Sequence, residues 1–214
     1  MKLGFIGLGI MGAPMALNLL NAGHTVFVSA KRKVPESVKG AGAVECADNE
    51  AVTRSADVVF VMVPDTPDVE AVLFGASGVA AGLSPSNGQR KVIVDMSSIS
   101  PMATKAFAQK INALGADYVD APVSGGQAGA VNGLLTVMCG GDADPFAAMQ
   151  PVAMAFSRAV TLVGAPGAGQ LAKMVNQICI AGLVQGLAEG LLFAEKAGLS
   201  IPDLVEVISQ GAAG

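Results

Sequence analysis

Six residues near the N-terminus, Gly7-Leu8-Gly9-Ile10-Met11-Gly12, stand between a strand pattern at 2–6 and a helix pattern at 11–21. The first glycine of such a run permits a tight turn, the second lets the backbone approach a pyrophosphate, and the third lets the helix pack closely on the strand. The free N–H groups at the start of the helix also attract an anion. In this strand–turn–helix context the six residues predict a dinucleotide-binding turn.

The rest of the chain alternates between strand and helix patterns. We expect strands at 2–6, 26–29, 43–44, 58–63, 92–94, 118–119, 134–139 and 160–163, with helices at 11–21, 34–40, 48–55, 101–114 and 145–156. The run Val58-Val59-Phe60-Val61-Met62-Val63 is apolar throughout, as in a strand buried on both faces. The alternation predicts an α/β fold with a doubly wound, mainly parallel Rossmann-type sheet.

The pattern changes after Gly164. Residues 167–197 contain no proline and form one long helix pattern, and a second helix is expected at 202–210. We therefore predict an NADP-binding Rossmann domain at 1–164. Residues 165–214 are expected to form an interdomain helix and the beginning of an incomplete α-helical C-terminal domain.

The composition narrows the class of protein. Hydrophobic residues make up 52% of the chain and charged residues 14%, which is typical of a globular protein. The net charge of -4 gives no reason to expect nucleic acid as a partner. The cysteines, Cys46, Cys139 and Cys179, are far apart and His24 is the single histidine, so no metal site is expected.

Two apolar stretches resemble membrane segments. Glycines and Pro14 interrupt the first, at 3–30, and Gln185 and Glu189 lie in the middle of the second, at 178–194. A carboxylate at the centre of a membrane span is costly, so we expect a buried helix of a soluble, cytoplasmic protein that does not associate with membranes.

The end of the second strand bears on the choice of cofactor. Folds of this type usually carry an acid there that binds the ribose hydroxyls, but this chain has Ala30 followed by Lys31, Arg32 and Lys33. Cations at this point can bind a 2′-phosphate through charge-assisted hydrogen bonds. We predict a preference for NADP over NAD; the alternative is that these are ordinary solvated cations.

Three further stretches, at 95–101, 120–126 and 164–177, carry polar or glycine-rich motifs. The first two follow strands, so they are expected to line one crevice at the carboxyl ends of the sheet. Together with the glycine turn, the motifs DMSSI, DAPVSGG, VMCGGD and GAGQLAKMVNQ closely resemble the β-hydroxyacid dehydrogenase family over all 214 residues. That family includes 3-hydroxyisobutyrate dehydrogenases and reductases of tartronate semialdehyde, glyoxylate and succinic semialdehyde, and the motifs look most like the tartronate semialdehyde reductases.

The resemblance implies an oxidoreductase with a catalytic lysine at Lys173. A partly desolvated ammonium can stabilise and protonate the alkoxide that hydride transfer creates. Asn176, one helical turn further on, would orient the substrate or the lysine. Related phosphogluconate dehydrogenases carry His-Asn where this chain has Asn176-Gln177, which argues against a phosphosugar substrate. Asp95 and Asp120 are interpreted as strand-end caps rather than a catalytic pair.

The resemblance also assigns binding residues. Ser124, Gly125 and Gly126 would bind the substrate carboxylate, since adjacent glycines expose backbone N–H groups. Ser98 would contact the nicotinamide or the substrate, and Val63 and Pro64 would pack beside the cofactor.

The sequence thus predicts an NAD(P)H-dependent reductase of a short carboxylate-bearing aldehyde, with NADP preferred and NAD as the alternative. A 3-hydroxyisobutyrate dehydrogenase is the second enzymatic alternative. A nucleotide-binding module with little or no turnover is the alternative from another class, since too little sequence follows residue 210 to complete a second core. Because family members pair through their helical domain, a homodimer or homotetramer is expected.

Overall fold

The computed structural model describes residues 1–29, 33–83 and 90–212. Its strands are β1 (Lys2–Ile6), β2 (Thr25–Ser29), β3 (Val44–Glu45), β4 (Val58–Val61), β5 (Val92–Asp95), β6 (Asp117–Asp120), β7 (Val123–Ser124), β8 (Leu135–Gly140) and β9 (Ser157–Gly164). Its helices are α1 (Gly12–Asn21), α2 (Glu36–Gly40), α3 (Asn49–Ser55), α4 (Thr66–Phe74), the 3-10 helix η1 (Val79–Gly82), α5 (Pro101–Ala113), α6 (Gly126–Asn132), α7 (Ala143–Ala153), α8 (Ala168–Lys196) and α9 (Ile201–Ser209). They form two compact units, Met1–Lys173 and Met174–Gly214.

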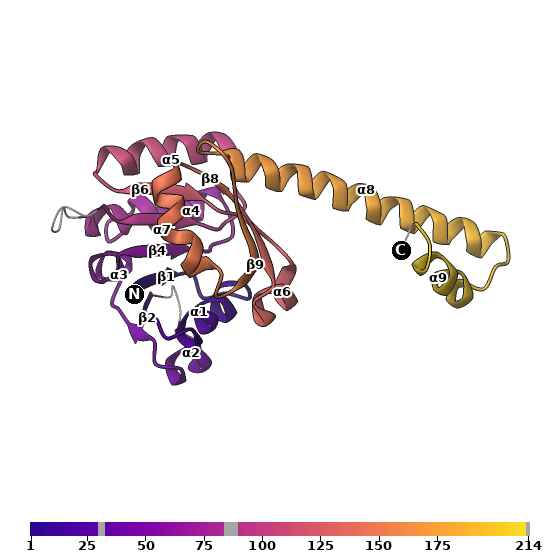
Figure 1. Cartoon of the computed structure of the whole chain (residues 1–214), viewed down its shortest axis with the longest axis horizontal. Helices are drawn as coiled ribbons and strands as arrows, with labels where there is room; N and C mark the ends of the chain where they lie inside the picture. Colours follow the sequence, from indigo (N-terminus) through magenta and orange to yellow (C-terminus); the bar gives the residue numbers. More distant parts are fainter. Residues whose placement is uncertain (30–32, 84–89, 213–214) are drawn as a thin grey trace. The chain divides into compact units, whose positions relative to one another are not determined.

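One sheet organises the first unit (Figure 1). Its strands lie in the order β3-β2-β1-β4-β5-β6-β8-β7, and β9 pairs with β8. All neighbours from β3 to β6 are parallel, so their carboxyl ends meet at one edge of the sheet. This is the doubly wound Rossmann-type arrangement that the strand–helix alternation predicts.

Helices cover both faces of the sheet because its central strands are apolar on both sides. On β4, Phe60 belongs to the core beneath α1, α2, α6 and α7, whereas Val59 belongs to the core beneath α3, α4 and α5. The first core contains an aromatic stack, with the ring centroids of Phe5 and Phe60 6.0 Å apart and those of Phe60 and Phe156 5.7 Å apart. Complete burial of each such ring contributes about 1.5–3 kcal/mol.

The structure departs from the expected pairing beyond β6. There β8 runs antiparallel to β6 and β7, and only β9 runs parallel to β8. The connection from β6 to β8 contains the seven-residue helix α6, which follows the two-residue strand β7, instead of a full crossover helix. Residues 123–132 therefore form a strand and a helix where the motif suggested only a loop.

Two elements were not predicted between β4 and β5. They are α4 and η1. The start signal of α4 is present in the sequence, because the side chain of Asp65 accepts a hydrogen bond from the N–H of Thr66 at 2.6 Å and Pro67 stands in the first turn. An acidic cap followed by proline is a usual helix start.

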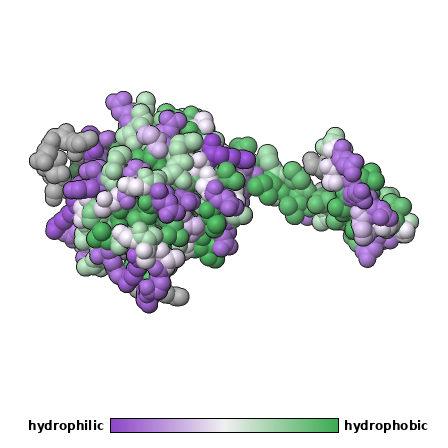
Figure 2. All heavy atoms as spheres, turned by 60° about the horizontal axis from the view of Figure 1, so that its bottom comes forward, coloured by the Kyte–Doolittle hydropathy of each residue, from purple (hydrophilic) through white to green (hydrophobic). Residues whose placement is uncertain are grey.

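The second unit consists of residues 174–214, with the remainder of α8 followed by α9. Between the helices, Gly198 takes a left-handed backbone conformation with φ +76°, and the N–H of Leu199 donates to the carbonyl of Ala194 at 3.0 Å. This is a common way to end a helix. The prediction of a buried helix at 178–194 is wrong for this structure, because Ile178 and Phe193 are more than 70% exposed, and Figure 2 shows apolar surface in green along α8. Among the described helices, α8 has the length and hydropathy of a membrane span.

Candidate active site

The turn between β1 and α1 is shaped for close backbone approach. Gly7 has φ +97°, and a Cβ atom there would collide with the carbonyl oxygen of Met62; a Cβ at Gly12 would collide with the carbonyl oxygen of Gly7. A Cβ at Gly9 would meet nothing within 4 Å, so the middle glycine borders open space. No side chain caps the start of α1 within the described structure. The turn therefore offers backbone N–H groups to an anion, and its residues fit a dinucleotide.

Neighbouring strand ends border this turn. Val63, just beyond β4, has a methyl group 3.0 Å from the position that a Cβ of Gly7 would take. The N–H of Val63 donates to Ser97 Oγ beyond β5 at 3.1 Å. Pro64 follows and is exposed. The glycine turn and the loops after β4 and β5 thus form one continuous edge.

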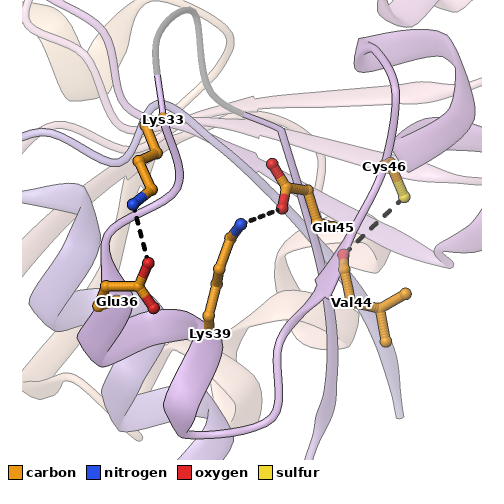
Figure 3. A network of polar contacts seen from close by, with 6 residues as sticks. All are labelled: Lys33, Glu36, Lys39, Val44, Glu45 and Cys46. Atoms are coloured by element: carbon orange, nitrogen blue, oxygen red, sulfur yellow. Dashed lines mark hydrogen bonds and ion pairs between the residues drawn. The ribbon is translucent and has the colours of Figure 1, made fainter.

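Most of the residues predicted to select NADP lie outside the residues that the structure describes. Ala30, Lys31 and Arg32 are not among the described residues. Lys33 is described, and Figure 3 shows its ammonium paired with the carboxylate of Glu36 at 2.9 Å. Both side chains are exposed, and such a pair is worth about 0–1 kcal/mol.

Two buried carboxylates lie at the ends of β5 and β6. Asp95 accepts hydrogen bonds from the hydroxyl of Tyr118 at 2.8 Å and from the N–H of Ser97 at 3.0 Å. Burial raises the pKa of Asp95 to about 6, although these hydrogen bonds act in the opposite direction. Asp95 therefore fixes the backbone at the start of the loop that follows β5.

Asp120 holds the start of α8. Its two oxygens accept hydrogen bonds from the N–H groups of Gly167 at 2.7 Å and Gln170 at 3.0 Å. Burial raises the pKa of Asp120, and the backbone donors partly offset this effect. Asp120 was interpreted as a strand-end cap, and its observed partners show that it caps the start of helix α8 from a strand 47 residues earlier.

The remaining predicted substrate residues lie in two places in the first unit, in the loop after β5 and at the junction of β7 and α6. Ser98 is exposed between the buried residues Ser97 and Ile99. Ser124 is half-buried at the end of β7, and Gly125 and Gly126 follow with φ +128° and +60°. L side chains rarely adopt such a backbone.

Lys173 and Asn176 lie on α8. Lys173 is half-buried, and burial lowers the pKa of its ammonium below the ordinary value for lysine. No ion pair among the described residues includes it. Asn176 belongs to the second unit, where its side chain donates to Gln177 Oε1 at 3.1 Å.

Hydrogen bonds join some of these residues but not others. The N–H of Val63 donates to Ser97 Oγ, and the side-chain amide of Gln170, three residues before Lys173, donates to the carbonyl oxygen of Ser97. No hydrogen bond between described residues ties Ser124 to this set. Ser97 and Gln170 had no predicted role, and the only signal for Gln170 was a polar side chain among small residues at the start of a long helix. In the described residues no group of His, Cys, Asp and Glu side chains could hold a metal ion.

The fold and the glycine turn define a dinucleotide-binding Rossmann-type protein. Two family models match the chain: the NAD-binding domain of 6-phosphogluconate dehydrogenase over residues 2–164, and the NAD-binding model of NADP-dependent 3-hydroxyisobutyrate dehydrogenase over residues 167–214. The chain belongs to this β-hydroxyacid dehydrogenase family of oxidoreductases, as its motifs suggested. The second model includes all of α8, so this long apolar helix is part of a known domain of the family.

Individual relatives agree with this assignment. The 2-hydroxy-3-oxopropionate reductase of Escherichia coli is 50% identical over 198 residues, which are 92% of this chain and 66% of that protein. A structure of Mycobacterium tuberculosis 3-hydroxyisobutyrate dehydrogenase with L-serine matches with a TM-score of 0.88 and 32% identity, covering 99% of this chain and 71% of that one. A structure of Psf3 in complex with NADP+ and 2-OPP matches with a TM-score of 0.89 and 29% identity, covering 99% and 73%.

Proposed function

We propose that this protein reduces a short carboxylate-bearing aldehyde to the hydroxy acid. Tartronate semialdehyde, also called 2-hydroxy-3-oxopropionate, is the first candidate, and glyoxylate or succinic semialdehyde is next. The observation that carries the proposal is a half-buried lysine with a lowered pKa on a helix anchored at the carboxyl ends of the sheet. The name of the Escherichia coli relative supports the choice of substrate.

The cofactor in this proposal is NADP, with NAD as the alternative. Gly7, Gly9, Ile10, Met11 and Gly12 would hold its pyrophosphate on the open side of the turn. When bound, the dinucleotide supplies the hydride.

Specificity and the reactive end of the cofactor involve other residues. Ala30, Lys31 and Arg32 would set the preference for a 2′-phosphate, because the first lacks the acid that binds a free ribose hydroxyl. Val63, Pro64 and Ser98 would line the side of the nicotinamide.

Lys173 would act as the general acid. Its ammonium donates a hydrogen bond to the carbonyl oxygen of the substrate, and it gives up a proton as negative charge develops on that oxygen. Partial burial strengthens the interaction because little water competes for the charge. Asn176 would orient the substrate or the lysine. Ser124, Gly125 and Gly126 would bind the carboxylate through a hydroxyl and backbone N–H groups.

Experiment can distinguish two alternative functions from this proposal. A 3-hydroxyisobutyrate dehydrogenase would use the same residues on a branched substrate, and the mycobacterial structure supports it. A nucleotide-binding module with little turnover would rely on the glycine turn alone. We also propose a domain boundary near residue 164, a cytoplasmic location, and a homodimer or homotetramer formed through the exposed apolar residues of the second unit.

The test is a panel of aldehydes with both cofactors. Oxidation of NADPH and NADH is followed at 340 nm with tartronate semialdehyde, glyoxylate, succinic semialdehyde and methylmalonate semialdehyde, and light scattering reports the assembly. The proposal expects the highest kcat/KM with tartronate semialdehyde and NADPH. Preference for methylmalonate semialdehyde would favour the dehydrogenase, and NADPH binding without turnover would favour the binding module.

A further inference from the structure

Gln170 is a polar side chain buried in the first turns of α8, with only 1% of its surface exposed. Its Oε1 accepts a hydrogen bond from the N–H of Ile99 at 3.0 Å, and its Nε2 donates to the carbonyl of Ser97 at 2.8 Å. One amide thus binds two backbone groups more than 70 residues away in the sequence. A buried amide with both ends paired fixes the groups around it, because breaking either bond leaves a buried polar atom unpaired.

The two backbone groups that Gln170 binds flank a single exposed residue, Ser98. Ser97 is held further, since its N–H donates to Asp95 and its hydroxyl accepts from Val63. The loop is therefore fixed immediately before and immediately after Ser98, while the Ser98 side chain itself faces outward.

The same glutamine also fixes the turn of helix that carries Lys173. Its backbone N–H donates to Asp120 at 3.0 Å. Residues three apart on a helix lie near the same face. Lys173 therefore lies near the side of α8 on which Gln170 binds the Ser98 loop. The Lys173 side chain takes part in no ion pair between described residues, so no described carboxylate holds its ammonium.

We propose that Gln170 is a positioning residue, which holds the Ser98 loop and the Lys173 turn in one fixed relation. The inference rests on the proposed function, because it assigns Gln170 to the alignment of the reduction step. A side chain with a purely structural role would affect folding but would leave the kcat of the folded enzyme intact. The two roles therefore make different predictions.

The first experiment is Gln170→Met, which keeps the length of the side chain and removes both hydrogen bonds. Gln109→Met is the matched control, because Gln109 is exposed on α5. We expect kcat to fall about 10- to 100-fold, as for a small misplacement of reacting groups, with the Kd of NADPH within about threefold of wild type. The control should match wild type. A folded Gln170→Met protein with kcat within twofold of wild type would overturn the proposal.

The second experiment is Gln170→Glu, which covers the case in which the methionine variant does not fold. The protonated introduced carboxyl can donate to Ser97 and accept from Ile99 as the amide does, whereas its ionised form opposes the Ser97 carbonyl. Burial raises the pKa of such a carboxyl. The ratio of variant to wild-type kcat should therefore fall as pH rises from about 5.5 to 8. Asp120 and Asp95, the carboxylates around Gln170 and Ser97, oppose the ionised form of the introduced carboxyl and raise its pKa further. A flat ratio would overturn the proposal.

Amide hydrogen exchange separates this inference from the proposed function. In the protein without cofactor, Gln170→Met should speed exchange at Ile99 at least about tenfold and leave β1 and β4 unchanged. If the wild-type protein reduces no aldehyde, the proposed function is wrong. If exchange at Ile99 in the variant is then also unchanged, Gln170 does not hold the Ser98 loop. Turnover in the wild type together with unchanged exchange at Ile99 in the variant would disprove the role of Gln170 and leave the proposed function intact.

Discussion

The first two turns of α8 and the rest of that helix differ in what their side chains contact. Residues 168–173 include the small, buried Gly169 and the polar, buried Gln170, both placed against the strand ends of the first unit. Residues 174–196 are rich in apolar side chains, yet Ile178, Leu183 and Phe193 are each more than two-thirds exposed. In this helix a glutamine is buried and the larger hydrophobic residues are not. Local hydrophobicity therefore does not decide burial; the partners available at each position do.

The largest expected effect is a loss of kcat on substitution of Lys173, in the first two turns of α8. Lys173→Ala should lower kcat by about 10²–10⁴-fold, because the proton donor is lost. The Kd of NADPH should change little, since the glycine turn is untouched. Steady-state kinetics and fluorescence titration measure the two quantities, with the exposed Lys196→Ala at the other end of α8 as the control. Retained turnover would remove Lys173 from its proposed role.

Loss of the helix cap should come next. Asp120→Ala leaves the buried N–H groups of Gly167 and Gln170 without their acceptor, and we expect the free energy of unfolding to fall by about 2–4 kcal/mol. Asp142→Ala is a matched control, since Asp142 precedes α7 without making a capping hydrogen bond. Urea denaturation gives both values. Equal losses in the two variants would show that Asp120 does not anchor α8.

Ionisation of the other buried carboxylate, Asp95, should make the free energy of unfolding depend on pH. Because the pKa of Asp95 rises from 3.8 to about 6 on folding, the folded protein favours the protonated form. The stabilisation from this group is complete below about pH 4 and is lost as pH rises to about 6, a change of about 3 kcal/mol at 1.36 kcal/mol per pKa unit. The Asp95→Asn variant should lack this contribution, so the difference in the free energy of unfolding between wild type and variant should itself fall as pH rises from about 4 to 6. Denaturation of both proteins between pH 4 and 8 measures it, and parallel curves would contradict the assignment.

The smallest effect on folding is expected in the second part of α8. Phe193→Ser should change the free energy of unfolding of the monomer by less than about 0.5 kcal/mol, because 73% of the side chain is already exposed. Its effect should instead appear in assembly, as a lower apparent mass by light scattering at equal concentration. Unchanged assembly together with a large loss of stability would show that this face is buried within a single chain.

Much of the fold could be predicted because its signals are local. The glycine turn, the strand at 2–6 and the helix that became Ala168–Lys196 each follow from short-range patterns. The candidate site was harder to predict. Ser97 and Gln170 lack any special spacing, and their importance comes from a hydrogen bond that joins positions 73 residues apart. The antiparallel β8 was missed for a related reason, since strand direction depends on how the chain returns to the sheet.

The alternation of strands and helices, the glycine turn at 7–12 and the family to which the chain belongs follow from the sequence alone. Those properties depend on side-chain periodicity and on glycine geometry, which neighbouring residues specify. The capping of α8 by Asp120 and the attachment of Gln170 to the loop at Ser98 became visible in the folded chain, where residues distant in sequence meet. A buried polar group must find a partner wherever the fold brings one, and that place is set by the packing of the whole sheet.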